Sequence, residues 1–110
     1  MKQSLVNDDW LAQTEPDPYL PGQDVVAWRP ANDGRIVLET FHRSNGTFGF
    51  RYQVWVEWRD AGDEVQGRSW HEIRSDFNVV TDALQQAQVA AENHAASKGV
   101  TLGPTWSPIV

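Results

Sequence analysis

Residues 48–59 alternate between apolar side chains and small or polar ones. The even positions are all apolar: Phe48, Phe50, Tyr52, Val54, Val56 and Trp58. Such alternation predicts a β-strand that buries one face and exposes the other. Trp55 is the exception, because this large aromatic lies among polar odd positions, on the face expected to meet water.

Similar patterns predict an antiparallel meander of four strands, at residues 24–30, 35–43, 47–59 and 65–74. The connections at residues 32–34 and 44–46 each end in glycine. That glycine suits a three-residue hairpin loop whose last residue is left-handed. A two-residue Asn-Gly turn is the alternative for the second connection, and it would change the register by one residue.

The apolar pattern decides between these two turns, since a one-residue slip turns a whole strand over. The three-residue loop forms one apolar face in which Ile36, Leu38, Thr40 and His42 lie opposite Val54, Tyr52, Phe50 and Phe48. The other face then has favourable pairs: Glu39 with Arg51, Phe41 with Gly49, and Arg35 with Trp55. The two-residue turn would bury Glu39 and expose Ile36 and Leu38, so we reject it.

The same test on the third connection favours a tight turn at residues 61–62. This turn places Trp58 opposite Val65, Val54 opposite Ser69 and Phe50 opposite Ile73. On the polar face it places Arg51 opposite Glu72, Trp55 opposite Arg68, and Gln53 opposite Trp70. A longer loop of the same parity would keep these faces. A loop at residues 32–34 places Val26 and Trp28 on the core face.

An alanine-rich segment, residues 80–97, predicts a helix across the apolar face of the sheet. Leu84, Ala87, Ala91 and Ala95 recur at helical spacing, Thr81 is the expected N-cap, and Gly99 follows the end. The predicted fold is therefore α+β: a four-stranded antiparallel meander sheet with one C-terminal helix packed on one face, in the order ββββα.

Three regions follow from this assignment: an N-terminal arm (1–23), the ββββα domain (24–99) and an extended C-terminal tail (100–110). The arm has a candidate helical turn at residues 8–13 and is then rich in proline, which favours irregular backbone. We expect four apolar residues to anchor it: Trp10, Leu11, Tyr19 and Leu20. Trp106 in the tail is expected to close the core, with a short recognition element as the alternative.

Composition narrows the function classes. The chain has 110 residues, a mass of 12.4 kDa and no cysteine, which excludes disulfides and thiolate metal sites. It has no apolar run long enough to cross a membrane, so we expect a cytoplasmic protein. Its net charge is −6, yet all seven arginines lie between Arg29 and Arg74. This arrangement favours specific paired contacts over generic nucleic-acid binding.

Catalytic chemistry has little support in the sequence. The register places His42 and His71 on the core face, with His94 on the helix above, but none has the spacing of a metal motif. His71-Glu72 resembles the start of the zinc-protease pattern of two histidines four residues apart, but position 75 is serine, not histidine. We therefore assign no catalytic residue, no metal ligand and no cofactor.

The outer sheet face, opposite the helix, is the remaining candidate. Tryptophan and arginine are the residue types enriched in binding hot spots, and we assign binding to Arg35, Phe41, Arg51, Trp55, Arg68 and Trp70. An alternative is that the arginines satisfy their own glutamates on this face, or that the arm covers it. The leading hypothesis is a small non-enzymatic interaction protein, of bacterial or phage accessory or inhibitor type by composition, that binds a protein partner.

Two other functions remain as alternatives. The first is a nucleic-acid-binding module that uses the same face, with aromatic rings stacked on bases. The second is a metal-dependent or hydrolytic enzyme centred on His71. In addition, Val25 and Ala27 lie on a first strand whose open edge would allow pairing with a second copy of the chain.

Overall fold

The computed structural model describes residues 11–12, 14–31, 34–73 and 79–109. These residues form one helix, α1 (Leu84–Ser97), and the strands β1 (Val25–Ala31), β2 (Ile36–His42), β3 (Phe48–Arg59), β4 (Val65–Ile73) and β5 (Ser107–Pro108). The sheet is antiparallel with strand order β4-β3-β2-β1-β5. The predicted α+β fold is confirmed, and a short fifth strand joins the four that were expected.

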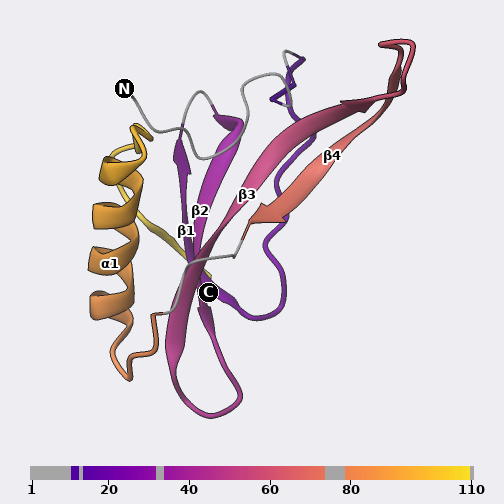
Figure 1. Ribbon diagram of the computed structural model, residues 1–110. Helices are drawn as coiled ribbons and strands as arrows, with labels where there is room; N and C mark the ends of the chain where they lie inside the picture. Colours follow the sequence, from indigo (N-terminus) through magenta and orange to yellow (C-terminus); the bar gives the residue numbers. More distant parts are fainter. Residues whose placement is uncertain (1–10, 13, 32–33, 74–78, 110) are drawn as a thin grey trace.

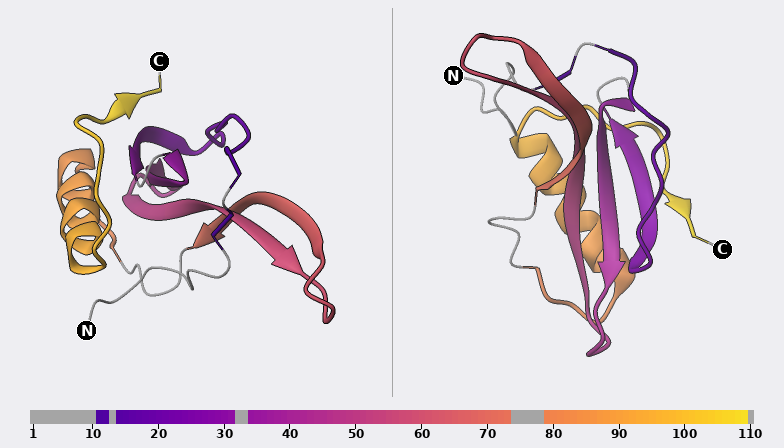
Figure 2. Two further views of the ribbon diagram at one scale, coloured as in Figure 1. Left: turned by 90° about the horizontal axis from the view of Figure 1, so that it is seen from above. Right: turned by 90° about the vertical axis from the view of Figure 1, so that its right-hand side faces the viewer.

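The elements form three layers (Figures 1 and 2). Helix α1 lies against one face of the sheet, where it contacts β2 and β3. The N-terminal arm crosses the opposite face, and the far end of the β3–β4 hairpin projects beyond the helix and the other strands. We call the helix-covered side the inner face and the arm-covered side the outer face.

The register between β2 and β3 matches the prediction. Ile36, Leu38, Thr40 and His42 lie opposite Val54, Tyr52, Phe50 and Phe48, and Glu39 lies opposite Arg51. Gly46 adopts the left-handed conformation with φ of 88°, and Arg43 accepts its backbone N–H at 3.0 Å. The three-residue loop is therefore correct, and the apolar pattern selected it because the alternative would bury Glu39 among apolar side chains.

The expected position of β1 is wrong by one residue. Ala31 pairs with Ile36, so the connection after β1 is one residue longer than the three-residue loop. This shift turns the strand over: Trp28 lies opposite Glu39 on the outer face, not in the core, and Ala27 and Arg29 lie on the inner face. Val26 stands at an irregularity between the two pairings of the strand.

The pairing between β3 and β4 has the predicted parity but different partners. Trp55 lies opposite Trp70, Val54 opposite His71, and Gln53 opposite Glu72. The connection runs over residues 60–64, where Asp60 donates its backbone N–H to the Glu64 carbonyl at 3.0 Å. A bulge at Trp58 and Arg59 accommodates the longer turn. Because the slip is two residues, the side chains of β4 from Gly67 onward keep their predicted face, whereas Val65, predicted opposite Trp58, lies opposite Arg59 at the bulge.

Helix α1 begins later than predicted and ends as predicted. Thr81 is not the N-cap, since the helix starts at Leu84 and Thr81 pairs with Phe48 at the start of β3. At the other end Gly99 has φ of 71°, and the amides of Gly99 and Val100 donate to the carbonyls of Ala96 and Ala95. This pair of hydrogen bonds is a Schellman motif, which a left-handed glycine makes possible.

The core lies between α1 and the inner face. Ala87, Ala91 and Ala95 of the helix are fully buried, together with Leu38 and Tyr52 of the sheet. Small helix side chains permit close approach of the helix to the sheet. From the inner face of β1, the Arg29 guanidinium bonds Glu92 of α1 at 2.7 Å and the Gly103 carbonyl at 2.6 Å, which ties the helix and the tail to the sheet.

The tail and the sheet edges complete the fold. Trp106 packs against the core cluster, as predicted. Ser107 and Pro108 of β5 pair with Trp28 and Ala27, so the first strand is not the open edge that was expected. In the part of the chain that the structure describes, no helix has the length and apolar character needed to cross a bilayer.

Candidate functional site

The outer face of β3 is buried, contrary to the simple interpretation of its alternation. Arg51, Trp55 and Glu57 are 4, 3 and 8% exposed, whereas Trp58 of the inner face is 49% exposed. Trp58 is the last residue but one of β3 and lies outside the core cluster, with its ring over Gly67 of β4. The position along the strand thus decides which tryptophan is buried.

The N-terminal arm buries this face through several polar contacts. The Trp55 indole Nε1 donates to the Thr14 hydroxyl at 3.4 Å, and the Trp70 indole Nε1 donates to the Asp17 carbonyl at 3.1 Å. Nearer the start of the arm, Ala12 donates its N–H to the Trp55 carbonyl at 3.1 Å and accepts from Arg35 Nε at 2.9 Å. The arm is therefore bonded to the tryptophan side chains it covers.

Tyr19 is the aromatic anchor of the arm. Its ring centroid lies 5.1 Å from that of Trp28 and 5.9 Å from that of Trp70, in tilted and edge-on geometries. Its hydroxyl donates to Glu39, which is fully buried on β2. Burial and the hydrogen bond to Glu39 raise the pKa of the Tyr19 phenol far above its usual value.

Three carboxylates surround the guanidinium of Arg51. Glu39 accepts from Nε at 2.7 Å, Glu72 lies 3.1 Å from Nε, and Asp24 accepts from Nη1 and Nη2 at 2.7 and 2.8 Å. Burial lowers the pKa of Arg51, but its hydrogen bonds to Asp24 and Glu39 outweigh that effect and raise it. We call this group the Arg51 cluster, and its one cation is shared by three anions.

Phe41 and Gly49 support the cluster from β2 and β3. The Arg51 guanidinium carbon lies 4.7 Å from the centre of the Phe41 ring, and that of Arg43 lies 4.9 Å from it. A Cβ atom at Gly49 would lie 2.9 Å from Phe41 and 2.5 Å from Arg43. Glycine is therefore required here, and the predicted cover of Gly49 by Phe41 is confirmed.

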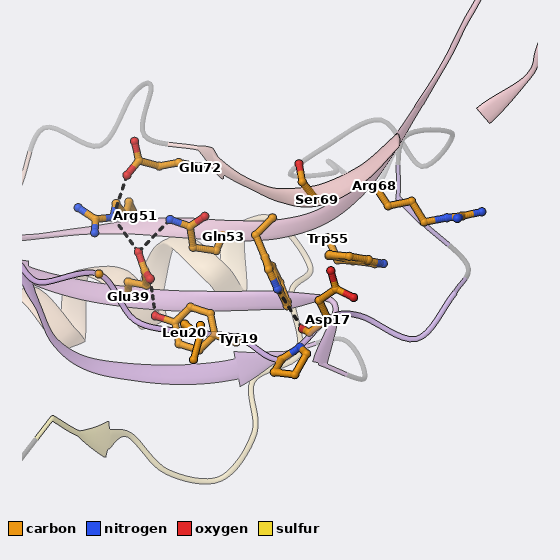
Figure 3. Close-up of a pocket in the computed structure, with 13 residues that line it drawn as sticks. Asp17, Tyr19, Leu20, Glu39, Arg51, Gln53, Trp55, Arg68, Ser69 and Glu72 are labelled. Atoms are coloured by element: carbon orange, nitrogen blue, oxygen red, sulfur yellow. Dashed lines mark hydrogen bonds and ion pairs between the residues drawn. The ribbon is translucent and has the colours of Figure 1, made fainter. Parts of the chain in front are cut away.

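A pocket opens between the arm and the outer face of β3 and β4 (Figure 3). Its volume is about 760 Å³, and its lining includes the rings of Tyr19, Trp55 and Trp70 and the polar side chains of Glu39, Arg51, Gln53 and Glu72. Trp70 contacts both other rings, with its ring centroid 5.6 Å from that of Trp55 and 5.9 Å from that of Tyr19, and the Tyr19 hydroxyl bonds Glu39. The pocket thus has an aromatic part and a polar part in contact.

The projecting hairpin has an ion-pair ladder of its own. Glu57 accepts from Arg59 at 2.7 Å and from Arg68 at 3.1 Å. Hydrogen bonds from Arg59 and Arg68 hold the pKa of the Glu57 carboxyl below its usual value, against the opposite effect of burial. Arg68 lines the pocket through its stem, while its guanidinium points away from the Arg51 cluster.

The structure brings together four of the six side chains assigned to binding. Arg51, Trp55, Arg68 and Trp70 line one pocket. Phe41 lies beneath Arg51, and Arg35 instead bonds the arm at Ala12. Trp55 and Arg51 are buried, so a partner could reach them through the pocket, not across a flat surface.

The residues that the arm contributes to the site were not predicted from the sequence. Tyr19 was expected to anchor the arm, but its contact with Glu39 was not foreseen, and Leu20 is 83% exposed instead of anchored. Trp10 and four of the six residues of the candidate turn at 8–13 lie outside the described residues. A buried Glu39 on an outer face was the available signal, because such a carboxylate needs donors.

The histidines have separate partners. His94 shares a hydrogen bond of 2.9 Å with the buried Tyr52 hydroxyl, His42 stacks on Phe48, and His71 is exposed on β4. Burial raises the pKa of Tyr52. Among the described residues, no group of three or more histidines and carboxylates could hold a metal ion.

Comparisons with protein-family models, curated proteins and solved structures found no match to this chain. The geometry of the pocket and its chemistry therefore carry the functional argument.

Proposed function

We propose that this chain is a small non-enzymatic interaction protein, of accessory or inhibitor type, that binds a protein partner through the pocket on its outer face. One observation carries the proposal: aromatic, arginine and carboxylate side chains converge on a single cavity of about 760 Å³. Cavities of roughly 300–1,000 Å³ with a few convergent polar groups are typical of binding sites.

The residue types in the pocket support a protein partner. Tryptophan, tyrosine and arginine are enriched among the residues that contribute most to the affinity of protein interfaces. Leu20 and Pro18 of the arm stand at the same pocket, and Leu20 is among the most exposed large apolar residues described. A partner side chain inserted beside Trp70 would also bury this exposed rim.

The arginine contacts weigh against phosphate recognition. Arg51 is shared by three carboxylates, and Arg59 and Arg68 bond Glu57. A nucleic-acid partner would have to compete with these anions. A chain without cysteine is compatible with a reducing compartment, and we place the interaction in the cytoplasm.

The test begins with affinity capture from the source cells by the tagged chain, followed by purification of each captured protein and titration against variants. We expect Trp70→Ala to weaken binding by about tenfold or more, as loss of a hot-spot tryptophan does. Val89→Ala, on the exposed side of α1, is the matched control and should leave the affinity unchanged.

The site on the complex is mapped by hydrogen exchange. Protection should appear in residues 14–23 and in β4 on partner binding. Protection confined to the end of the β3–β4 hairpin or to α1, or equal affinity for the Trp70→Ala variant, would overturn the proposal. Capture of nucleic acid with a steep salt dependence would favour the nucleic-acid alternative instead.

A further inference from the structure

We infer that the outer-face pocket takes a cationic side chain, arginine or lysine, presented by its partner. This inference rests on the proposed function and adds the chemical class of the group that is recognised. It follows from three features of the pocket: its aromatic walls, the charge of its lining, and the way its own arginines are held.

The aromatic walls suit a cation. Tyr19, Trp55 and Trp70 line the cavity, and Trp70 meets the two other rings at 60° and 77°. Rings set at such angles surround a space with their edges and faces, which is the arrangement that recognises organic cations through the negative faces of the rings. An uncharged apolar side chain would use these walls without this attraction.

The negative charge of the pocket lining also favours a cationic ligand. Three acidic residues, Asp17, Glu39 and Glu72, line the pocket together with two arginines, and only Arg51 directs its guanidinium toward these carboxylates, since that of Arg68 points away. The Arg51 charge is also shared with Asp24, and Arg68 bonds Glu57 at 3.1 Å. The net charge of the whole chain, −6, adds attraction for a basic partner.

Glu72 is positioned to meet the incoming cation. It lies on β4 two residues from Trp70, so the two side chains share the outer face. Its side chain is 35% exposed, whereas those of Glu39 and Arg51 are 1 and 5% exposed. A guanidinium stacked on Trp70 could therefore reach the Glu72 carboxylate without entering the buried part of the Arg51 cluster.

The experiment uses two small probes of nearly equal shape, Nα-acetyl-arginine amide and the uncharged Nα-acetyl-citrulline amide. Each is titrated into the full chain while the indole N–H signals are followed by two-dimensional NMR, with assignments from Trp→Phe variants. We expect the arginine probe to shift the Trp70 indole signal saturably and to bind about tenfold more tightly than the citrulline probe.

Two glutamate variants locate the effect. Glu72→Gln should weaken the arginine probe about three- to tenfold. Glu64→Gln removes the same charge from the exposed end of the hairpin and should leave the affinity unchanged. Equal affinity for the two probes, no saturable shift with either, or an equal loss in both glutamate variants would each overturn the inference. The comparison of probes on the unmodified chain holds even if Glu72→Gln does not fold.

The outcomes also separate this inference from the proposed function. A protein partner lost on Trp70→Ala but indifferent to Glu72→Gln, with no probe binding, would leave the proposed function standing and remove the cation. If the arginine probe binds at the pocket but Trp70→Ala leaves the partner affinity unchanged, the pocket recognises a cation and the proposed protein-binding function falls.

Discussion

The two faces of β3 are buried to a similar extent but by different chemistry. On the inner face, Tyr52 and Val54 pack against fully buried alanines of α1. On the outer face, Arg51 and Trp55 are covered by the arm and held by hydrogen bonds and ion pairs. The inner face depends on shape and apolar area, whereas the outer face depends on matched charges and donors.

This difference indicates which face can hold a binding site with the smaller loss of stability. A close-packed apolar layer tolerates neither a gap nor an added group. The outer face contains a pocket, an arm that supplies part of its wall, and carboxylates in excess of their nearest guanidinium. Substitutions that separate these two kinds of burial test the comparison most directly.

The largest effect is expected from Arg51→Met. This change leaves the buried Glu39 without its cation, and breaking a buried ion pair on one side costs about 3–5 kcal/mol. The free energy of unfolding, measured by urea denaturation at pH 7, checks it. Arg68→Met is the matched control and should cost much less, because its ion pair is partly exposed. Equal losses would show that the outer face is not held by the Arg51 cluster.

Ala91→Leu should produce the next largest effect, on the inner face. Ala91 is fully buried between α1 and the sheet, so the larger side chain would push the helix away at a cost of about 1–3 kcal/mol. Ala96→Leu makes the same change on the exposed side of the helix and should be nearly neutral. The comparison uses thermal and urea unfolding, and a neutral Ala91→Leu would contradict close packing at this interface.

Tyr19→Phe should lower the stability by about 1.5 kcal/mol at pH 7, because the hydrogen bond from the Tyr19 hydroxyl to the buried Glu39 is lost. The pH dependence adds a second test. The pKa of Tyr19 is raised in the folded state, so above about pH 10 the unfolded chain loses the phenol proton while the folded chain keeps it. Stability is therefore full below this pH and falls as the pH rises.

Urea unfolding from pH 8 to 11 measures this fall, and Tyr19→Phe should show a shallower decline than the unmodified chain. Tyr52 also has a raised pKa and stays as an internal reference, since it is present in both proteins. Parallel declines in the two proteins would mean that the arm does not bury the Tyr19 hydroxyl.

The smallest effect on stability is expected from Trp58→Phe, and Trp55→Phe serves as its comparison. Trp58 is half-exposed and should contribute most of its fluorescence to the iodide-quenchable fraction, whereas the buried Trp55 should contribute little. Trp58→Phe should therefore reduce the quenchable fraction and Trp55→Phe should not. The opposite result would place the arm away from the outer face.

Most of the fold could be predicted from the sequence, because the apolar alternation restricts the register strongly. The β2–β3 pairing followed from the cost of placing Glu39 on the apolar face with Ile36 and Leu38 turned outward, and the faces of β4 followed from parity. The position of β1 could not be obtained this way. Val26 and Trp28 looked suitable for the core, yet one extra residue in the connection turned the strand and put Trp28 opposite Glu39.

The candidate site could be predicted in part from the sequence. Four of the six assigned residues line one pocket, because residues of one parity on neighbouring strands share a face whatever the length of the turn. The contribution of the arm could not be predicted, since its proline-rich segment has no periodicity that would indicate a surface to pack against.

The sequence by itself determined which side chains of β3 share a face, since a period of two follows from the geometry of an extended chain. Only the tertiary structure decided which of those faces meets water at each point along the strand. Trp58 lies outside the core cluster beneath the helix and the arm bonds Trp55, so the tryptophan in the apolar series is exposed and the one among polar residues is buried. Burial depends on what covers a face, and the covering segments lie far away in the chain.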